Sequence, residues 1–305
     1  MLFYKLEYKK EIHMKLLALD IGGSFIKYGV FDKYQLIMEG KRPSEGSLGG
    51  PYIVKNVSEI IEEISRDYSL EGVAISTAGV VDVDKGEIIH AGHTIPNYRG
   101  FNWKTYIGEK YGLACEVEND VNCAGLSEYL NGVCQNEDMV LCLAIGTGIG
   151  ASFIKDGQVY HGASSSACEV GYLNVDGKEF QKIASANSLV EYYRKKSQDE
   201  KADGRVIFDL AKKKDPLAIE SIDYMVDNLA KGIASISLIL NPRILVLGGG
   251  IMEQEDYLRP KIEEKLDEYM LPISRGAMDL RFAKNGNLAG TYGALYHFYK
   301  KRKED

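Results

Sequence analysis

The chain has 305 residues, a formal net charge of −7 and a pI near 5.4. This acidic balance argues against a nucleic-acid-binding surface, which would need a basic patch, and no apolar run approaches the ~20 residues that span a bilayer. The five cysteines are widely spaced without a C-x-x-C pair, and no export signal opens the chain. We therefore expect a globular cytoplasmic protein that binds neither nucleic acid nor membrane.

The first half of the chain predicts an α/β pattern. The first thirteen residues show no clear period and are expected to form a peripheral extension before a strand that opens at Met14. Strands are predicted over 16–21, 25–31, 35–38, 72–77 and 114–118, and helices over 54–68, 101–111 and 120–130. Asp120 follows the last of these strands, where it could serve as the N-cap of the next helix.

The second half begins a similar pattern again. Strands are predicted over 139–145, 151–154, 244–247 and 279–283, and helices over 188–196, 205–214, 217–240, 257–269 and from 289 onward, the last one amphipathic. The tetrapeptide Ser24-Phe25-Ile26-Lys27 recurs as Ser152-Phe153-Ile154-Lys155, each time after a glycine turn. This repeat favours two duplicated halves.

Three glycine turns each follow an apolar strand, at Gly22-Gly23, Gly146–Gly150 and Gly248–Gly250. Glycine allows positive φ and removes side chains, so that backbone N–H groups can converge on an anion. Ser24 adds a hydroxyl, and Asp20 is well placed to hold a hydrated Mg²⁺. One such turn is as consistent with an ordinary hairpin, but three in order favour phosphate binding, although neither a G-x-G-x-x-G nor a Walker motif is present.

Four motifs together resemble the ROK family of sugar kinases and repressors, within the actin and hexokinase ATPase superfamily. They are Asp20-Ile21-Gly22-Gly23, Glu118-Asn119-Asp120-Val121-Asn122-Cys123-Ala124, Ile145-Gly146-Thr147-Gly148-Ile149-Gly150 and Leu247-Gly248-Gly249-Gly250-Ile251. The resemblance extends from Met14 to about Phe298. It implies an actin-like (ribonuclease H-like) α/β fold with a small domain (14–118 plus 289–305), a large domain (119–288) and a cleft between them. It also implies ATP, Mg²⁺ and a homodimer.

The resemblance assigns roles to individual residues. Asp120 would be the catalytic base. Sugar contacts would come from Asn97, Asn119, Asp120 and Glu169, and ATP contacts from Asp20, Gly22, Gly23, Ser24, Lys27, Gly146, Thr147, Gly148, Gly248, Gly249 and Gly250. Structural alternatives stay open: a helix cap for Asp120, turn chemistry for Asn97 beside Pro96, and a solvated loop charge for Glu169. Tyr172 could bind the sugar or only pack.

The chain departs from the family pattern after Glu169. The usual histidine is replaced by Tyr172, and no cysteine follows Cys168. The ligands of the family's structural zinc are therefore missing, and we expect no zinc site. This variant is more similar to the zinc-free glucokinase and β-glucoside kinase branch, and thirteen residues cannot hold the repressors' helix-turn-helix.

The predicted function is ATP-dependent phosphorylation of a hexose, at the 6-hydroxyl of glucose or a β-glucoside. The alternatives are an N-acetylhexosamine kinase of the N-acetylmannosamine type and a non-catalytic sugar-sensing relative.

Overall fold

The computed structural model describes residues 15–92 and 95–303. Its first sheet has five strands in the order β3 (Gln35–Pro43), β2 (Phe25–Asp32), β1 (Lys15–Ile21), β4 (Leu70–Thr77) and β7 (Ala114–Asn119). β1, β2 and β3 pair antiparallel, whereas β4 and β7 run parallel to β1. The predicted extension over residues 1–13 and the predicted strand start at Met14 lie outside the described residues.

The second sheet repeats this strand order with β10 (Gln158–Val159), β9 (Ile149–Lys155), β8 (Met139–Ile145), β13 (Ile244–Gly248) and β14 (Asp279–Phe282). Again a hairpin precedes two parallel strands. The common topology supports the predicted duplication of the two halves.

The repeated tetrapeptide, however, is not at equivalent positions. In the first sheet, Ile26 of the tetrapeptide pairs with the last residue of β1. In the second sheet, the residue that pairs with the last residue of β8 is Ile149, and not Ile154 of the repeated tetrapeptide. The two copies also differ in burial, since Phe25 is 41% exposed and Phe153 only 7%. The identical letters are therefore a coincidence, and the duplication lies in the topology.

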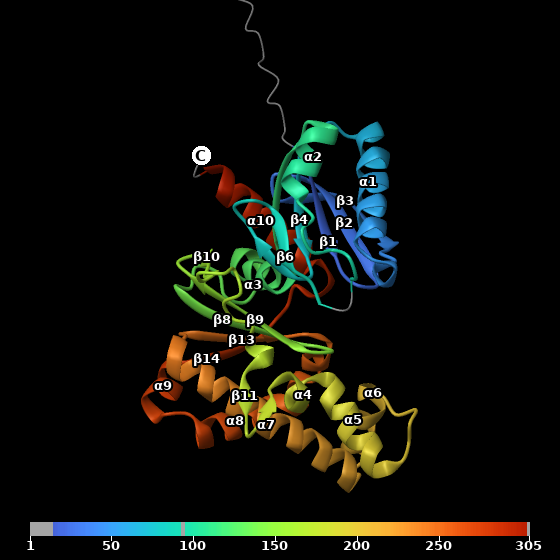
Figure 1. Cartoon of the computed structure of the whole chain (residues 1–305). Helices are drawn as coiled ribbons and strands as arrows, with labels where there is room; N and C mark the ends of the chain where they lie inside the picture. Colours follow the sequence, from blue (N-terminus) through green and yellow to red (C-terminus); the bar gives the residue numbers. More distant parts are fainter. Residues whose placement is uncertain (1–14, 93–94, 304–305) are drawn as a thin grey trace, which may run out of the picture.

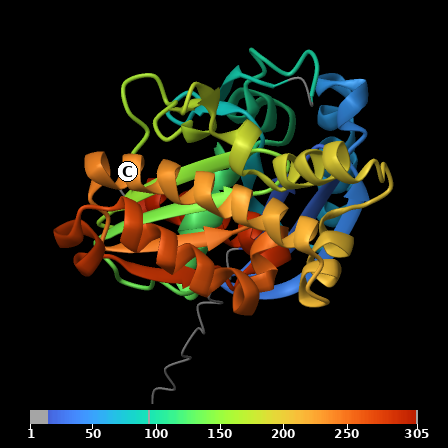
Figure 2. The same ribbon diagram turned by 90° about the horizontal axis from the view of Figure 1, so that it is seen from below.

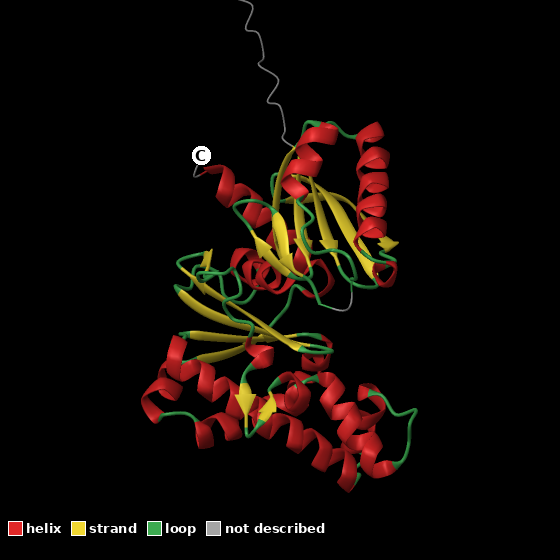
Figure 3. Ribbon diagram, in the orientation of Figure 1, coloured by secondary structure: helices red, strands yellow, loops and turns green. Residues whose placement is uncertain are grey.

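Helices cover the outer faces of both sheets (Figures 1 and 3). α1 (Gly50–Asp67) and α2 (Trp103–Tyr111) pack on the first sheet. The outer face of the second sheet packs against five helices, which Figure 2 shows from below: α4 (Gln181–Ala184), α5 (Ala186–Ser197), α6 (Gly204–Lys212), α7 (Pro216–Leu240) and α8 (Glu255–Tyr269). α9 (Pro272–Ala277) leads into β14. Two small hairpins are added, β5 (Val80–Asp82) with β6 (Glu87–His90), and β11 (Asn174–Val175) with β12 (Lys178–Glu179).

Two helices lie between the sheets (Figure 1). α10 (Ala289–Lys303) packs on the first sheet, and α3 (Asp120–Asn131) packs on the second. The two helices touch at Gly293, where an added Cβ would overlap the carbonyl of Cys123. α10 is thus enclosed by the first sheet on one side and by α3 on the other, whereas its sequence predicts an amphipathic helix with one polar face.

Successive side chains of β1 point to opposite faces of the sheet, so this strand contributes to two hydrophobic cores. Leu17 and Leu19 belong to the core under α1, whereas Leu16 and Ala18 belong to the core under α10. The division into domains 14–118 plus 289–305 and 119–288 stays a prediction. No helix within the described residues combines the length and the apolar character needed to cross a membrane.

Candidate active site

Three parallel strands end at one edge of the first sheet. In their register, Asp20 of β1 lies beside Ser76 of β4, and Ser76 lies beside Glu118 of β7. One residue further along, Thr77 lies beside Asn119. Because parallel strands present their carboxyl ends together, residues distant in sequence meet at this edge.

Asn119, and not Asp120, is the N-cap of α3. The Oδ1 atom of Asn119 accepts hydrogen bonds from the backbone N–H groups of Val121 at 2.9 Å and Asn122 at 3.1 Å. The Nδ2 atom of Asn119 donates to the Gly79 carbonyl at 2.9 Å and to Asp120 Oδ1 at 3.1 Å. The prediction that Asp120 caps the helix is therefore wrong, because the extended backbone that a cap requires occurs one residue earlier.

Asp120 is the first residue of α3 and is half-buried. Its Oδ1 also accepts from the Val121 N–H at 2.9 Å. Burial, together with the nearby carboxylates of Asp20 and Glu169, raises the pKa of Asp120 to about 7. This carboxylate can therefore exchange a proton near neutral pH, which is what a general base requires.

Asp20 lies at the end of β1 and is fixed on three sides. Ser76 Oγ donates to Asp20 Oδ1 at 2.9 Å, and Lys27 Nζ lies 3.9 Å from Oδ2. Gly290 of α10 packs so closely that an added Cβ would overlap the Asp20 carboxyl group. Burial raises the pKa of Asp20, against the opposing effects of Ser76 and Lys27.

The glycine turns differ in their need for glycine. In the first turn, neither Gly22 nor Gly23 has the positive φ that the sequence suggests. In the third turn, Gly249 has φ +101°. A Cβ at Gly249 would overlap the carbonyl of Ile145 at the end of β8. The first turn is instead held by Ser44, whose Oγ donates to the Gly23 carbonyl at 2.6 Å.

A cavity of about 470 Å³ adjoins the third glycine turn. Its walls are Gly248–Gly250, the inner side of α3 including Val121 and Gly125, and Asn287 before α10. Asn287 Oδ1 accepts from Lys27 Nζ at 3.4 Å, which connects this cavity to the Asp20 cluster. In the second turn, the Gly146 N–H donates to the Gly148 carbonyl at 2.9 Å, and Thr147 is exposed.

The expected sugar contacts are only partly brought together. Glu169 acts on the pKa of Asp120, and its own pKa is raised by burial and opposed by His90. Asn97 has φ +57° in an exposed loop, and Tyr172 is 64% exposed. Among the described residues, neither the Asn97 nor the Tyr172 side chain forms a hydrogen bond with this cluster.

Sequence reasoning missed two residues that support this edge. Ser76 donates a hydrogen bond to Asp20. Glu118 belongs to the Glu118–Ala124 motif and is completely buried next to Asn119. The partner of Glu118 is His161, with 2.7 Å between His161 Nε2 and Glu118 Oε2. Nothing local in the sequence connects two residues so far apart in the chain.

Comparison with known proteins agrees with the geometry. The ROK family model matches residues 16–301. An uncharacterised protein of Clostridium perfringens is 42% identical over 92% of this chain and 96% of its own. A beta-glucoside kinase of Klebsiella pneumoniae is 30% identical over 93% of this chain and 96% of its own.

Other relatives carry different names. A glucokinase of Thermotoga maritima and an N-acetyl-D-glucosamine kinase of Vibrio parahaemolyticus are each 25% identical over 92% of this chain, and over 96% and 98% of their own. The structure of a ROK hexokinase from Thermus thermophilus is 28% identical and superposes with a TM-score of 0.83, over 96% of this chain and 100% of the other. The chain belongs to the ROK family and has the actin-like ATPase fold of ROK sugar kinases.

Proposed function

We propose that this sugar kinase transfers the γ-phosphate of ATP to the 6-hydroxyl of glucose or of a β-glucoside, with Asp120 as the general base. The observation that carries the proposal is the position of Asp120 at the start of α3, where burial and the carboxylates of Asp20 and Glu169 raise its pKa to about 7. Phosphoryl transfer to a hydroxyl group needs a carboxylate that accepts the proton, and donors around the phosphates. The three glycine turns and Lys27 are the proposed donors.

The sugar would lie against Glu169, Asn97 and Tyr172, with its 6-hydroxyl directed at Asp120. The hydrogen-bonding groups of Asn119 are already engaged, since Oδ1 accepts twice and Nδ2 donates twice. A sugar hydroxyl bound to Asn119 would therefore replace one of these bonds. The existing bonds also hold the carboxyl group of Asp120 in one orientation.

Asp20 fits an outer-sphere Mg²⁺. One carboxylate near a phosphate site is the usual protein contribution to a magnesium ion that keeps most of its water ligands. The Ser76 bond occupies Oδ1 and leaves Oδ2 on the side of Lys27. When bound with ATP, Mg²⁺ would neutralise charge on the β- and γ-phosphates.

In the reaction, the 6-hydroxyl gives its proton to Asp120 as its oxygen bonds to the γ-phosphorus. The bond from the γ-phosphorus to the β,γ-bridging oxygen breaks, and ADP leaves with that oxygen. Lys27 would stabilise the negative charge of the transferred group, together with the backbone N–H groups of Gly23, Ser24, Thr147 and Gly148. The N–H groups of Gly22 and Gly146 already donate to Phe25 and Gly148 within their turns.

A sugar panel tests this proposal. ADP release is measured with glucose, cellobiose, N-acetylglucosamine and N-acetylmannosamine, and we expect kcat/KM to be at least about 10-fold higher for glucose or cellobiose. A preference for an N-acetylhexosamine would instead support the second candidate, which the relative from Vibrio parahaemolyticus favours. Sugar binding without ADP release would refute the kinase assignment.

A further inference from the structure

Glu118 is a completely buried carboxylate two residues before the proposed base. Its Oε1 accepts from the Asn119 N–H at 2.8 Å and from Asn122 Nδ2 at 2.9 Å. These two bonds span the junction of β7 and α3, where Asp120 lies. The other oxygen, Oε2, accepts from His161 Nε2 at 2.7 Å, and His297 Nδ1 lies 3.6 Å from it. One oxygen thus holds the junction, and the other connects it to a different part of the chain.

Glu118 and His161 form a hydrogen-bonded pair, and each shifts the pKa of the other. The largest single effect on the pKa of Glu118 is burial, which raises it. The hydrogen bond from His161 and the charges of His297 and His161 together outweigh burial, so the pKa of Glu118 lies below its ordinary value. For His161, burial lowers the pKa, but Glu118 reverses the effect and the net shift is upward. Lys301 also acts on His161 and lowers its pKa, Asp84 raises it, and His297 interacts electrostatically with His161 as well.

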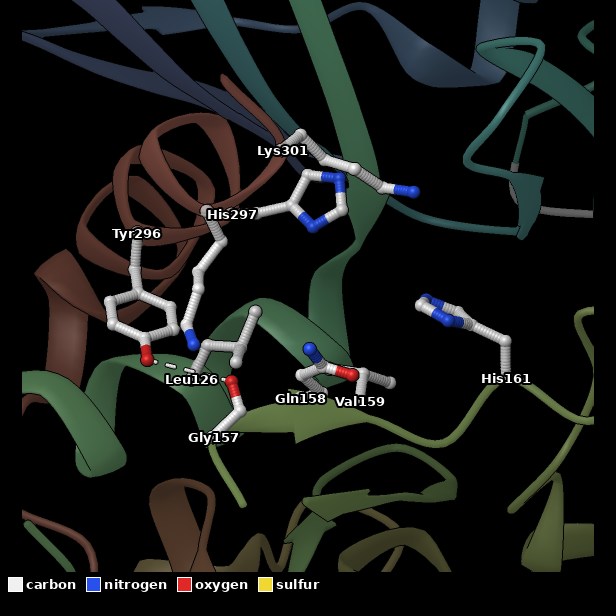
Figure 4. A pocket seen from close by; sticks show the side chains of 9 residues that line it. Leu126, Gly157, Gln158, Val159, His161, Tyr296, His297 and Lys301 are labelled. Atoms are coloured by element: carbon white, nitrogen blue, oxygen red, sulfur yellow. Dashed lines mark hydrogen bonds between the residues drawn. The ribbon is translucent and has the colours of Figure 1, made fainter. Parts of the chain in front are cut away.

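His161 lies between the sheets, just after β10. Figure 4 shows His161 and His297 of α10 on opposite sides of a cavity of about 120 Å³ that Tyr296 and Gly157 also line. The His161 ring points across this cavity toward α10 (Figure 4). Its side chain therefore crosses from the second half of the molecule to the end of β7 in the first.

The backbone of His161 anchors the segment that carries Glu169. The His161 carbonyl accepts from the Ala167 N–H at 3.1 Å, two residues before Glu169. The loop that this bond closes contains Gly162 at φ +68° and Ser165 at φ +56°, so its own backbone is not a regular element. Contacts therefore run from Glu118 through His161 to the segment of Glu169.

We propose that His161 is a positioning residue that holds the Glu169 segment in register with Asn119 and Asp120 through its hydrogen bond to Glu118. The inference rests on the proposed function, because it makes sugar binding depend on this bond. His161 is not among the proposed sugar or ATP contacts. Its removal acts on the sugar side of the site, because the ATP contacts come from other loops.

Steady-state kinetics of three variants test the proposal. H161A should raise the sugar KM about 10- to 100-fold, the range expected for a lost hydrogen bond to a charged group, whereas the KM for ATP should stay within about threefold. H161Q keeps an N–H donor at a similar reach and should restore the sugar KM to within about threefold of wild type. Y160A is the matched control, because Tyr160 is the neighbouring residue, is 56% exposed and is expected to leave both KM values unchanged.

Hydrogen exchange of the ligand-free protein gives a readout that does not depend on activity. Amides over 162–168, Ala167 included, should exchange faster in H161A than in wild type, H161Q or Y160A. If wild type phosphorylates no sugar, the proposed function fails, and this comparison still tests the link. The proposal is overturned if exchange is unchanged in H161A, if H161Q is as impaired as H161A, or if the sugar and ATP KM values rise equally.

Discussion

Replacing Asp120 by asparagine should greatly slow turnover while making the folded protein more stable than wild type above neutral pH. The variant keeps the shape of the side chain, and Asn119 remains the cap of α3. It removes the anionic acceptor for the hydroxyl proton, so kcat should fall about 10²- to 10⁴-fold with a much smaller change in sugar affinity.

The stability change follows from the pKa of Asp120, which folding raises from 3.8 to about 7. A carboxyl group with a raised pKa binds its proton more tightly in the folded state, so the protein loses stability as pH rises from about 4 to 7. The shift corresponds to about 4 kcal/mol at most, and to less here because the side chain is partly solvent-accessible. Asparagine does not titrate, so the variant does not lose this stability as the pH rises.

Two measurements check this reasoning. The Tm of Asp120→Asn relative to wild type should increase between pH 5 and pH 8, by a few degrees for about 2 kcal/mol. The kcat/KM of wild type should fall below about pH 7 as Asp120 is protonated. A variant that turns over at the wild-type rate, with sugar binding confirmed, would refute the assignment of the base. A Tm difference independent of pH would refute its raised pKa.

Three further predictions concern other parts of the molecule. Gly249→Ala should raise the KM for ATP and lower the free energy of unfolding by about 1–3 kcal/mol, because φ is +101° there. Denaturant titration measures the free energy of unfolding, and an unchanged free energy would contradict backbone strain at position 249. Elemental analysis should find no stoichiometric zinc, since Tyr172 and the absence of later cysteines leave no ligand set, and one zinc per chain would refute this. Scattering should show a more compact protein with sugar bound; identical profiles would argue against closure.

The order of strands and helices was largely predictable from the sequence, because apolar periodicity and glycine turns are local signals. The α7 helix, for example, ends just before Pro242, as its sequence predicts. The cap of α3 was misplaced by one residue, because both Asn119 and Asp120 are good cap residues and only the backbone angles distinguish them.

The support of the candidate site was not predictable in this way. Ser76 and Glu118 lie on strands that read simply as buried, and their roles depend on the register with β1. The bond from His161 to Glu118 depends on how two halves of the chain pack, for which no local pattern exists. Conversely, the repeated tetrapeptide is a clear sequence signal, but its two copies lie at different positions in the two sheets.

The contact between Gly293 and Cys123 has a consequence for acidity at the proposed base. α3 begins with Asp120, and α10 places Gly290 against Asp20, so the crossing of the two helices fixes the separation of the two carboxylates. The repulsion between them falls with distance. A larger residue at position 293 would push the helices apart and lower the pKa of Asp120, both by admitting water to a carboxyl group whose pKa is raised mainly by burial and by weakening its repulsion from Asp20. The absence of a side chain at Gly293, which lies away from the proposed substrate contacts, thereby adjusts the pH at which the enzyme can accept a proton.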